Sequence, residues 1–145
     1  MDPKPHAKYL GKKYPIQLQP FLEGKPQKPT ISFDGRQFLV THSDGSPPDL
    51  QVLLTRFYHK AAKDVIKQRL AHYQPMVKTK FKAFTIESHP DKWGSCSSER
   101  KLTFHWYLIT YPLEALDYVV VHELCHLEHL NHDRSFWRLA VRETD

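Results

Sequence analysis

Apolar and polar side chains alternate along the first third of the chain in a way that is typical of strands. Within residues 1–32, which are rich in proline and lysine, the segment YPIQLQPFL alternates and predicts one extended segment among turns. The segment TISFDGRQFLVTH predicts a hairpin, with Asp34 and Gly35 as the turn between two β-rich runs. We therefore expect residues 1–48 to form a strand-rich N-terminal part.

The spacing of apolar residues changes to that of a helix after the loop SDGSPPD. From Leu50 to about Tyr73 we expect an amphipathic helix, and Asp49 is placed to cap its start. The residues expected on its apolar face are Leu54, Phe57, Tyr58, Ala61 and Val65, and those on its polar face are Arg56, Lys60, Lys63 and Lys67. The polar face is therefore a basic stripe.

The last third of the chain predicts two strands followed by helices. FKAFTIES and KLTFHWYLI alternate and are expected to pair as antiparallel neighbours, with HPDKWGSCSSER as the loop between them. Thr110 and Pro112 mark the start of a helix that should run to about Leu130, where Asn131 can end it. Asp133 can cap a short final helix that carries Phe136, Trp137 and Ala140.

Length and composition indicate one folded domain, residues 1–145. A chain of 145 residues supports one hydrophobic core, and its apolar fraction of 40% is that of a globular protein. The start MDPKPHAKYLGKKY lacks the apolar core of a signal peptide, and no apolar run approaches the roughly 18 residues that span a bilayer. Cys96 and Cys125 form no disulfide framework and fit a reducing compartment. We expect a cytoplasmic protein without membrane association.

The net charge of +5 is distributed unevenly. Residues 1–80 carry 14 Lys and Arg against 6 Asp and Glu, whereas residues 81–145 carry 7 against 10. A basic surface attracts nucleic acid through counterion release, and the stripe of Arg56, Lys60, Lys63 and Lys67 is the place where we expect such contact. The alternative is that these side chains only solubilise a small domain.

The segment VVVHELCHLEHLNHDRSFW, residues 119–137, carries the chemistry. On a helix His122 and His126 lie on one face and can bind one metal ion, with Glu123 beside them; this is the H-E-x-x-H arrangement. In it the metal lowers the pKa of a bound water, and the glutamate takes the proton as the water attacks a carbonyl. The alternative is a helix whose histidines are only satisfied polar groups.

A catalytic zinc requires a third protein ligand. His132 follows His122 by ten positions, the separation found in extended H-E-x-x-H motifs, and we favour it. His129 lies three residues after His126, but a continuous helix carries it past the metal; Glu143 stands at a short separation for a glutamate ligand on a following helix. We expect one Zn²⁺ per chain.

Residues 93–137 resemble the signature region of the YgjP-like metallopeptidase family, which shares W-G-S-C-S, a strand, and then H-E-L-x-H-L-x-x-x-N-H-x-x-x-F-W. The resemblance implies an α+β, zincin-like fold in which a small antiparallel sheet packs on the active-site helix. It implies that His122, His126 and His132 bind zinc, that Glu123 is the general base, and that the chain is related to SprT- and WLM-type metalloproteases, among them enzymes that digest DNA–protein crosslinks. Lys92, His105 and Tyr107 depart from the family pattern, which has arginine, asparagine and arginine there.

Several further residues are candidates for the substrate cleft. In zincins an edge strand beside the active-site helix binds peptide by strand addition, and Leu102–Trp106 is the expected strand. Trp93 and Cys96 belong to a compact loop that can line the cleft, and Cys96 is a candidate latent zinc ligand. Candidates for stabilising the oxyanion are His105, Tyr107, Tyr118 and His129.

The sequence favours a zinc metallopeptidase acting on peptide or protein substrates. One alternative is a nucleotide phosphoanhydride hydrolase (a pyrophosphatase), which requires basic residues near the metal; the acidic balance of residues 81–145 counts against it. Another alternative is a nucleic-acid-binding module whose metal site is not catalytic.

Overall fold

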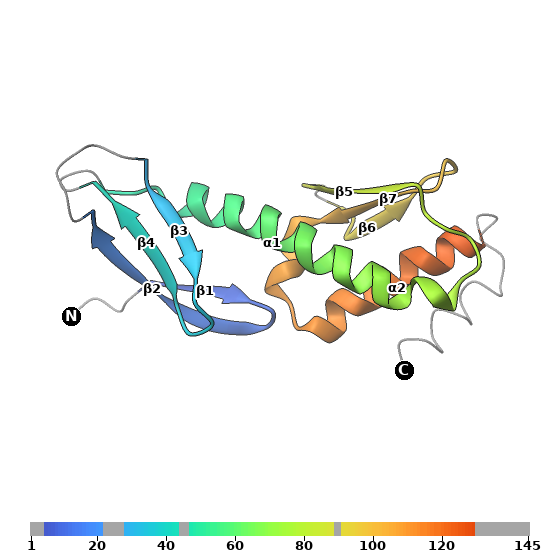
Figure 1. Ribbon diagram of the computed structural model, residues 1–145, viewed down its shortest axis with the longest axis horizontal. Coiled ribbons are helices and arrows are strands. Elements are labelled where there is room, and N and C mark those ends of the chain that lie inside the picture. The colour runs from blue at the N-terminus through green and yellow to red at the C-terminus, as the bar shows by residue number, and fades with distance from the viewer. Residues whose placement is uncertain (1–4, 22–27, 44–46, 89–90, 130–145) are drawn as a thin grey trace.

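The computed structural model describes residues 5–21, 28–43, 47–88 and 91–129. In these ranges two small mixed sheets are connected by a long helix, α1, and a second helix, α2, lies beside the C-terminal half of α1 (Figure 1).

The N-terminal sheet consists of β1 (His6–Tyr9), β2 (Lys12–Pro20), β3 (Thr30–Phe33) and β4 (Phe38–His42), and α1 spans Leu50–Tyr73. The second sheet consists of β5 (Ala83–Glu87), β6 (Gly94–Cys96) and β7 (Lys101–His105), and α2 spans Leu113–Glu128. The short 3-10 helices are η1 (Gln74–Met76) and η2 (Trp106–Thr110). The architecture is α+β, as expected.

The N-terminal sheet has the strand order β1-β2-β4-β3. The predicted β3–β4 hairpin is confirmed: its turn is held by Asp34, whose Oδ1 accepts hydrogen bonds from the backbone N–H groups of Arg36 and Gln37 at 2.8 and 2.9 Å. The single extended segment expected in residues 1–32 is instead a second hairpin, β1–β2, and β2 pairs in parallel with β4. The sequence did not indicate β1, because its four residues are too few to show alternation.

The β1–β2 turn connects the two halves of the fold. The backbone N–H of Leu10 donates to Ile109 O at 2.7 Å, and that of Gly11 donates to Thr110 O at 2.9 Å. Gly11 has a φ of +86°, and a Cβ at this position would lie 2.9 to 3.0 Å from Pro112. Glycine is required here both for the left-handed conformation and for the close approach. The turn therefore packs on the start of α2.

Helix α1 is confirmed with the predicted limits. Asp49 caps it, and its side chain accepts from Val52 N at 3.2 Å. The buried stripe is Leu53, Tyr58, Ala62, Ile66 and Leu70. Of the face predicted as apolar, only Tyr58 is buried, and the other members are partly buried and pack against the core. The buried stripe is rotated because α1 is covered by two sheets and α2 rather than by a single layer.

The second sheet differs from the prediction. Its order is β5-β7-β6, with β5 parallel to β7 and β6 antiparallel to β7. The predicted antiparallel pairing of the segments that form β5 and β7 was wrong. Strand β6 lies in the segment predicted as a loop and forms a hairpin with β7, so the chain reverses direction once more and β7 runs parallel to β5. The second predicted strand also ends early, at His105, where the side chain accepts from Tyr107 N and η2 begins.

One hydrophobic core joins both sheets and both helices. Its largest fully buried side chains include Phe38 and Val40 from β4, Ile66 and Leu70 from α1, Phe104 from β7, and Leu116 and Leu124 from α2. Full burial of one such side chain stabilises a fold by roughly 1.5–3 kcal/mol. This core fixes α2 against the second sheet. Within the described ranges, neither long helix has the length and apolar character needed to cross a membrane.

Candidate metal centre

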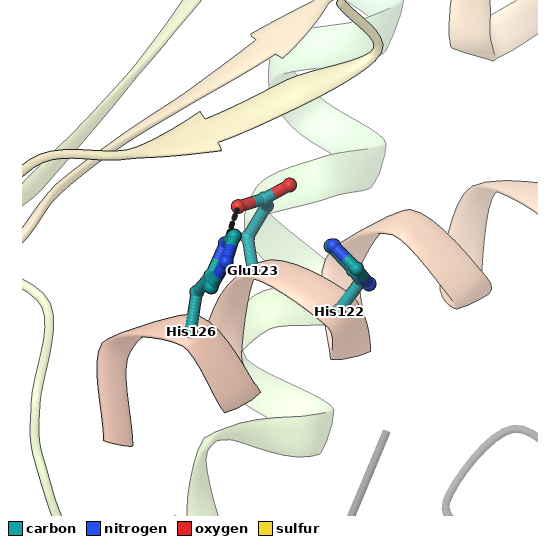
Figure 2. A group of neighbouring side chains, drawn as sticks. All are labelled: His122, Glu123 and His126. Carbon is teal, nitrogen blue, oxygen red and sulfur yellow. Dashed lines mark hydrogen bonds and ion pairs between the residues drawn. The ribbon is translucent and has the colours of Figure 1, made fainter. Parts of the chain in front are cut away.

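Helix α2 carries the candidate metal centre on the side that faces the second sheet (Figure 2). Val120 and Leu124 are fully buried and fix the rotation of the helix. With that rotation, the Glu123 side chain is 4% exposed and that of His126 is 18% exposed, while His122 is half-buried. The three polar side chains lie at the boundary between core and solvent.

The three side chains converge. His126 Nδ1 lies 3.1 Å from Glu123 Oε1, and the ring centroids of His122 and His126 are 5.1 Å apart. Among the described residues these three form the group that can hold a metal ion, with ligand atoms all within 4.8 Å of one another. Two nitrogens that share zinc at about 2.0–2.1 Å each are at most about 4 Å apart, so small side-chain rotations suffice for shared coordination. The residues present fit a metal ion.

The charge state of His122 also fits a metal ligand. Burial lowers the pKa of His122, and the neighbouring His126 adds to this, while the negative charge of Glu123 opposes the change. A neutral imidazole has a free lone pair for a metal. The site therefore favours the form of His122 that can bind a metal.

Strand β6 packs directly on Glu123, and sequence analysis missed this contact. A Cβ built at Gly94 would lie 3.0 Å from Val119 Cγ1 and 3.1 Å from both Cγ and Oε2 of Glu123. The glycine of WGSC thus allows the backbone to approach the carboxylate. Gly94 offered one signal for this, since a glycine inside a strand often marks a close backbone approach.

The expected substrate strand was placed wrongly. Leu102–Trp106 covers most of β7, which is the central strand of its sheet and has no open edge. The strand beside α2 is β6, and it lies at the edge of the sheet. Periodicity could not reveal this, because a three-residue strand containing glycine shows no pattern.

Cys96 lies in β6 but does not belong to the His122, Glu123 and His126 group that could hold a metal ion. Its Sγ is half-buried and contacts Ser97 O at 3.6 Å. Burial, with the negative charge of Glu123, raises the pKa of the Cys96 thiol to about 11. The thiolate is the form that binds metal, so in the absence of a bound cation the raised pKa keeps Cys96 protonated.

The remaining candidates from the sequence lie in different parts of the structure. Trp93, His105 and Tyr107 form a ring cluster, in which Trp93 stacks on Tyr107 with ring centroids 6.4 Å apart. The Tyr118 ring stacks on His122 at 6.2 Å. His129 is the C-terminal cap of α2, and its N–H donates to Cys125 O. His132 and Glu143, like the predicted final helix, lie outside the described residues.

Two polar contacts, neither expected from the sequence, hold α2 in place. Arg69 of α1 forms a bidentate pair with Asp117, with Nε at 2.7 Å from Oδ1 and an Nη atom at 2.6 Å from Oδ2. At the other end, Glu128 Oε2 accepts from the backbone N–H groups of Lys78 and Thr79 at 3.1 and 2.8 Å. The H-E-x-x-H turn lies between these two contacts.

An α+β domain that presents a largely buried His-Glu-His group on one helix has the features of a metal-dependent hydrolase. Comparison with family models is specific: the model described as YgjP-like, metallopeptidase domain, matches residues 2–144. The chain therefore belongs to the YgjP-like metallopeptidase family. Comparisons with curated proteins and with solved structures give no significant match.

Proposed function

We propose that this chain is a zinc-dependent peptidase in which Glu123 acts as the general base. The observation that carries the proposal is the convergence of His122, Glu123 and His126 on one face of α2, beneath an edge strand. Membership of a metallopeptidase family supports a metal-dependent hydrolase. The identity of the metal, the third ligand and the roles of the residues are our inference.

His122 and His126 would hold the ion, and His132 is proposed as the third protein ligand. When bound, zinc supplies Lewis acidity, which polarises a carbonyl and acidifies water. Glu123 is left as a base rather than a ligand, because catalytic zinc sites use three protein ligands and keep one position open. One zinc per chain is expected.

Glu123 is positioned to move a proton. Its carboxylate is almost fully buried, and Gly94 shields one side of it. We assign it to accept a proton from the attacking water and then to donate that proton to the leaving amine. A base held this closely by α2 and β6 loses little orientational freedom when substrate binds.

The edge strand β6 is the proposed binding site for the peptide backbone. Among the described strands only β7 pairs with β6, so the other edge of β6 can accept an added strand. An extended peptide bound there would lie over α2, beside Glu123. Because β6 has only three residues, it can supply few backbone hydrogen bonds, and side-chain contacts must contribute to affinity.

The test has two parts. Metal content is measured by plasma mass spectrometry on wild type, His132→Ala and the matched control His129→Ala, all purified without a histidine tag. We expect about one zinc per chain in wild type and in His129→Ala, and loss in His132→Ala. Casein cleavage is then measured for wild type and Glu123→Gln.

Each outcome has a distinct meaning. Cleavage that Glu123→Gln abolishes, with zinc content retained, supports the proposed roles. A wild-type chain that takes up no zinc at neutral pH contradicts the proposed function. Zinc that is lost in His129→Ala but kept in His132→Ala contradicts only the third ligand.

A further inference from the structure

The exposed face of α1 carries a row of cations that form no salt bridge with an acidic side chain among the described residues. Arg56, Lys60, Lys63 and Lys67 are all exposed, and none takes part in the salt bridges found among the described residues. Arg69, on the same helix, is paired with Asp117. The row covers eleven residue steps, which is about 16 Å of helix at 1.5 Å per residue. It forms a strip of positive charge along one side of α1.

A groove lies beside this strip and is lined by residues of α1 and of the edge strand β5. We call it the α1–β5 groove; it has a volume of about 640 Å³ and is lined by Thr55, Arg56, His59, Lys60, Lys63, Phe84, Thr85 and Ile86. Its α1 wall is cationic, and Phe84 and Ile86 contribute half-buried apolar surface from β5. None of its lining residues is acidic. A second groove also borders the strip, at Arg56 and Lys60, but its lining includes Asp64 and is therefore less favourable for an anion.

A row of aromatic rings extends from the α1–β5 groove toward α2, the helix that carries the candidate metal centre. The ring centroids of His59 and Trp106 are 5.6 Å apart. Trp106 is held in place because it stacks on Tyr58, with ring centroids 5.8 Å apart, and because its Nε1 donates a 2.6 Å hydrogen bond to Ser88 Oγ. Trp106 contacts Tyr107 at 5.4 Å, and Tyr107 stacks on Trp93. Tyr107 and Trp93 are 40% and 44% exposed, and both contact the exposed ring of Tyr111, so the three form an exposed aromatic patch.

We propose that the α1–β5 groove and this row of rings bind single-stranded nucleic acid. Cations that follow one line bind successive phosphates, and exposed rings stack with bases; the combination is characteristic of single-strand binding surfaces. The bases of a duplex are stacked on one another and cannot use these rings. An acidic polypeptide would pair with the cations but would leave the ring faces unused. The rings lead to Trp93, which precedes the Gly94 that covers Glu123, so the strand is directed toward the candidate metal centre.

Binding is measured by fluorescence anisotropy with a labelled 20-nucleotide single strand, at a series of salt concentrations. The variant Lys60→Glu/Lys63→Glu is compared with Lys12→Glu/Lys13→Glu, whose exposed lysines lie in β2 and which changes the net charge equally. We expect at least 10-fold weaker binding for the first variant and less than 3-fold for the control. Loss of two phosphate contacts should reduce the slope of log K against log salt by about 1.4. Circular dichroism checks that both variants fold.

The role of the rings has its own readout. Stacking of bases should quench the tryptophan fluorescence of wild type, and Trp106→Phe should reduce that quenching while leaving the salt slope unchanged. No binding at low salt would overturn the proposal, as would equal weakening in both double variants. It would also be overturned by a preference for duplex, or by displacement of the strand by polyglutamate at equal charge concentration. The assay needs no peptidase activity, so its outcome is separate from that of the proposed function.

Discussion

Gly94 and Glu123 are so close that a single methyl group on the glycine would lie 3.1 Å from Oε2 of the carboxylate. This relationship brings together the two motifs of the site, WGSC in β6 and H-E-x-x-H in α2, through the backbone of Gly94 rather than through a side chain. It explains in physical terms why a strand of three residues lies against α2. It also makes the position of Glu123 dependent on a residue that carries no functional group.

Gly94→Ala should therefore lower both activity and stability. The added methyl group also lies 3.0 Å from Val119 Cγ1, so either β6 or the Glu123 side chain must shift. We expect casein cleavage to fall by on the order of 10-fold or more, because small displacements of catalytic groups are costly. Overpacking should lower the free energy of unfolding by roughly 1–3 kcal/mol, measured by urea denaturation.

Gly35→Ala is the matched control for this substitution. Gly35 has a φ of +95° and nothing within 4 Å of an added Cβ, so the cost there is backbone strain of roughly 1–2 kcal/mol. Its cleavage rate should equal that of wild type at a temperature where both are folded. If Gly94→Ala cleaves as fast as Gly35→Ala, the close contact has no role in positioning Glu123.

The sequence could predict those features that depend on the residues of a single helix or strand. Helix α1 is signalled by 24 residues of regular spacing and by its Asp49 cap, and the grouping of His122, Glu123 and His126 follows from helical spacing alone. The parallel pairing of β5 with β7 could not be predicted, since it depends on β6, whose three residues have no periodicity.

Contacts between distant residues gave no signal either. Arg69 and Asp117 are 48 positions apart, and each looks like an ordinary exposed charge in the sequence. The approach of Gly94 to Glu123 likewise becomes visible only when strand and helix are packed together. The third zinc ligand stays a prediction, because His132 lies outside the described residues.

Arg69→Ala should destabilise the fold. Arg69 and Asp117 form a bidentate pair with side chains 25% and 14% exposed, and Tyr73 donates a further hydrogen bond to Asp117 at 3.0 Å. Removing the guanidinium leaves the carboxylate without its cation, and we expect a loss of about 2 kcal/mol in the free energy of unfolding. Lys101→Ala is the control: its pair with Glu99 is exposed, and its loss should change stability by less than about 0.5 kcal/mol. Equal effects of the two substitutions would contradict a structural role for the Arg69–Asp117 pair.

Cys96 should react slowly with iodoacetamide at neutral pH. Burial and the charge of Glu123 raise the pKa of its thiol from the ordinary value of 9.0 to about 11, so the thiolate fraction at pH 7.5 is small. A thiolate of higher pKa is more nucleophilic, and the net effect should be a rate about 10-fold below that of an exposed thiol. The rate should rise with pH up to the region of the raised pKa.

Ser98→Cys supplies an exposed thiol for comparison, in the turn between β6 and β7. Peptide mapping by mass spectrometry measures alkylation at Cys96 and at the introduced thiol separately from that at the buried Cys125. Glu123→Gln removes a negative charge that raises the pKa of Cys96, so alkylation of Cys96 should become faster in this variant. An unchanged rate would mean that the carboxylate charge does not act on the thiol.

Zinc should stabilise the folded chain through the two helical histidines. A ligand present at 100 times its dissociation constant adds about 2.7 kcal/mol to the stability of the folded state. For a chain of this length that corresponds to a rise in Tm of about 5–10 °C, measured by differential scanning fluorimetry after removal of metal with a chelator. His122→Ala should abolish the rise, because one of the two converging imidazoles is lost. His72→Ala, an exposed histidine at the end of α1, should keep it. If zinc raises the Tm of His122→Ala as much as that of wild type, the ion binds elsewhere and the His-Glu-His group on α2 is not the metal centre.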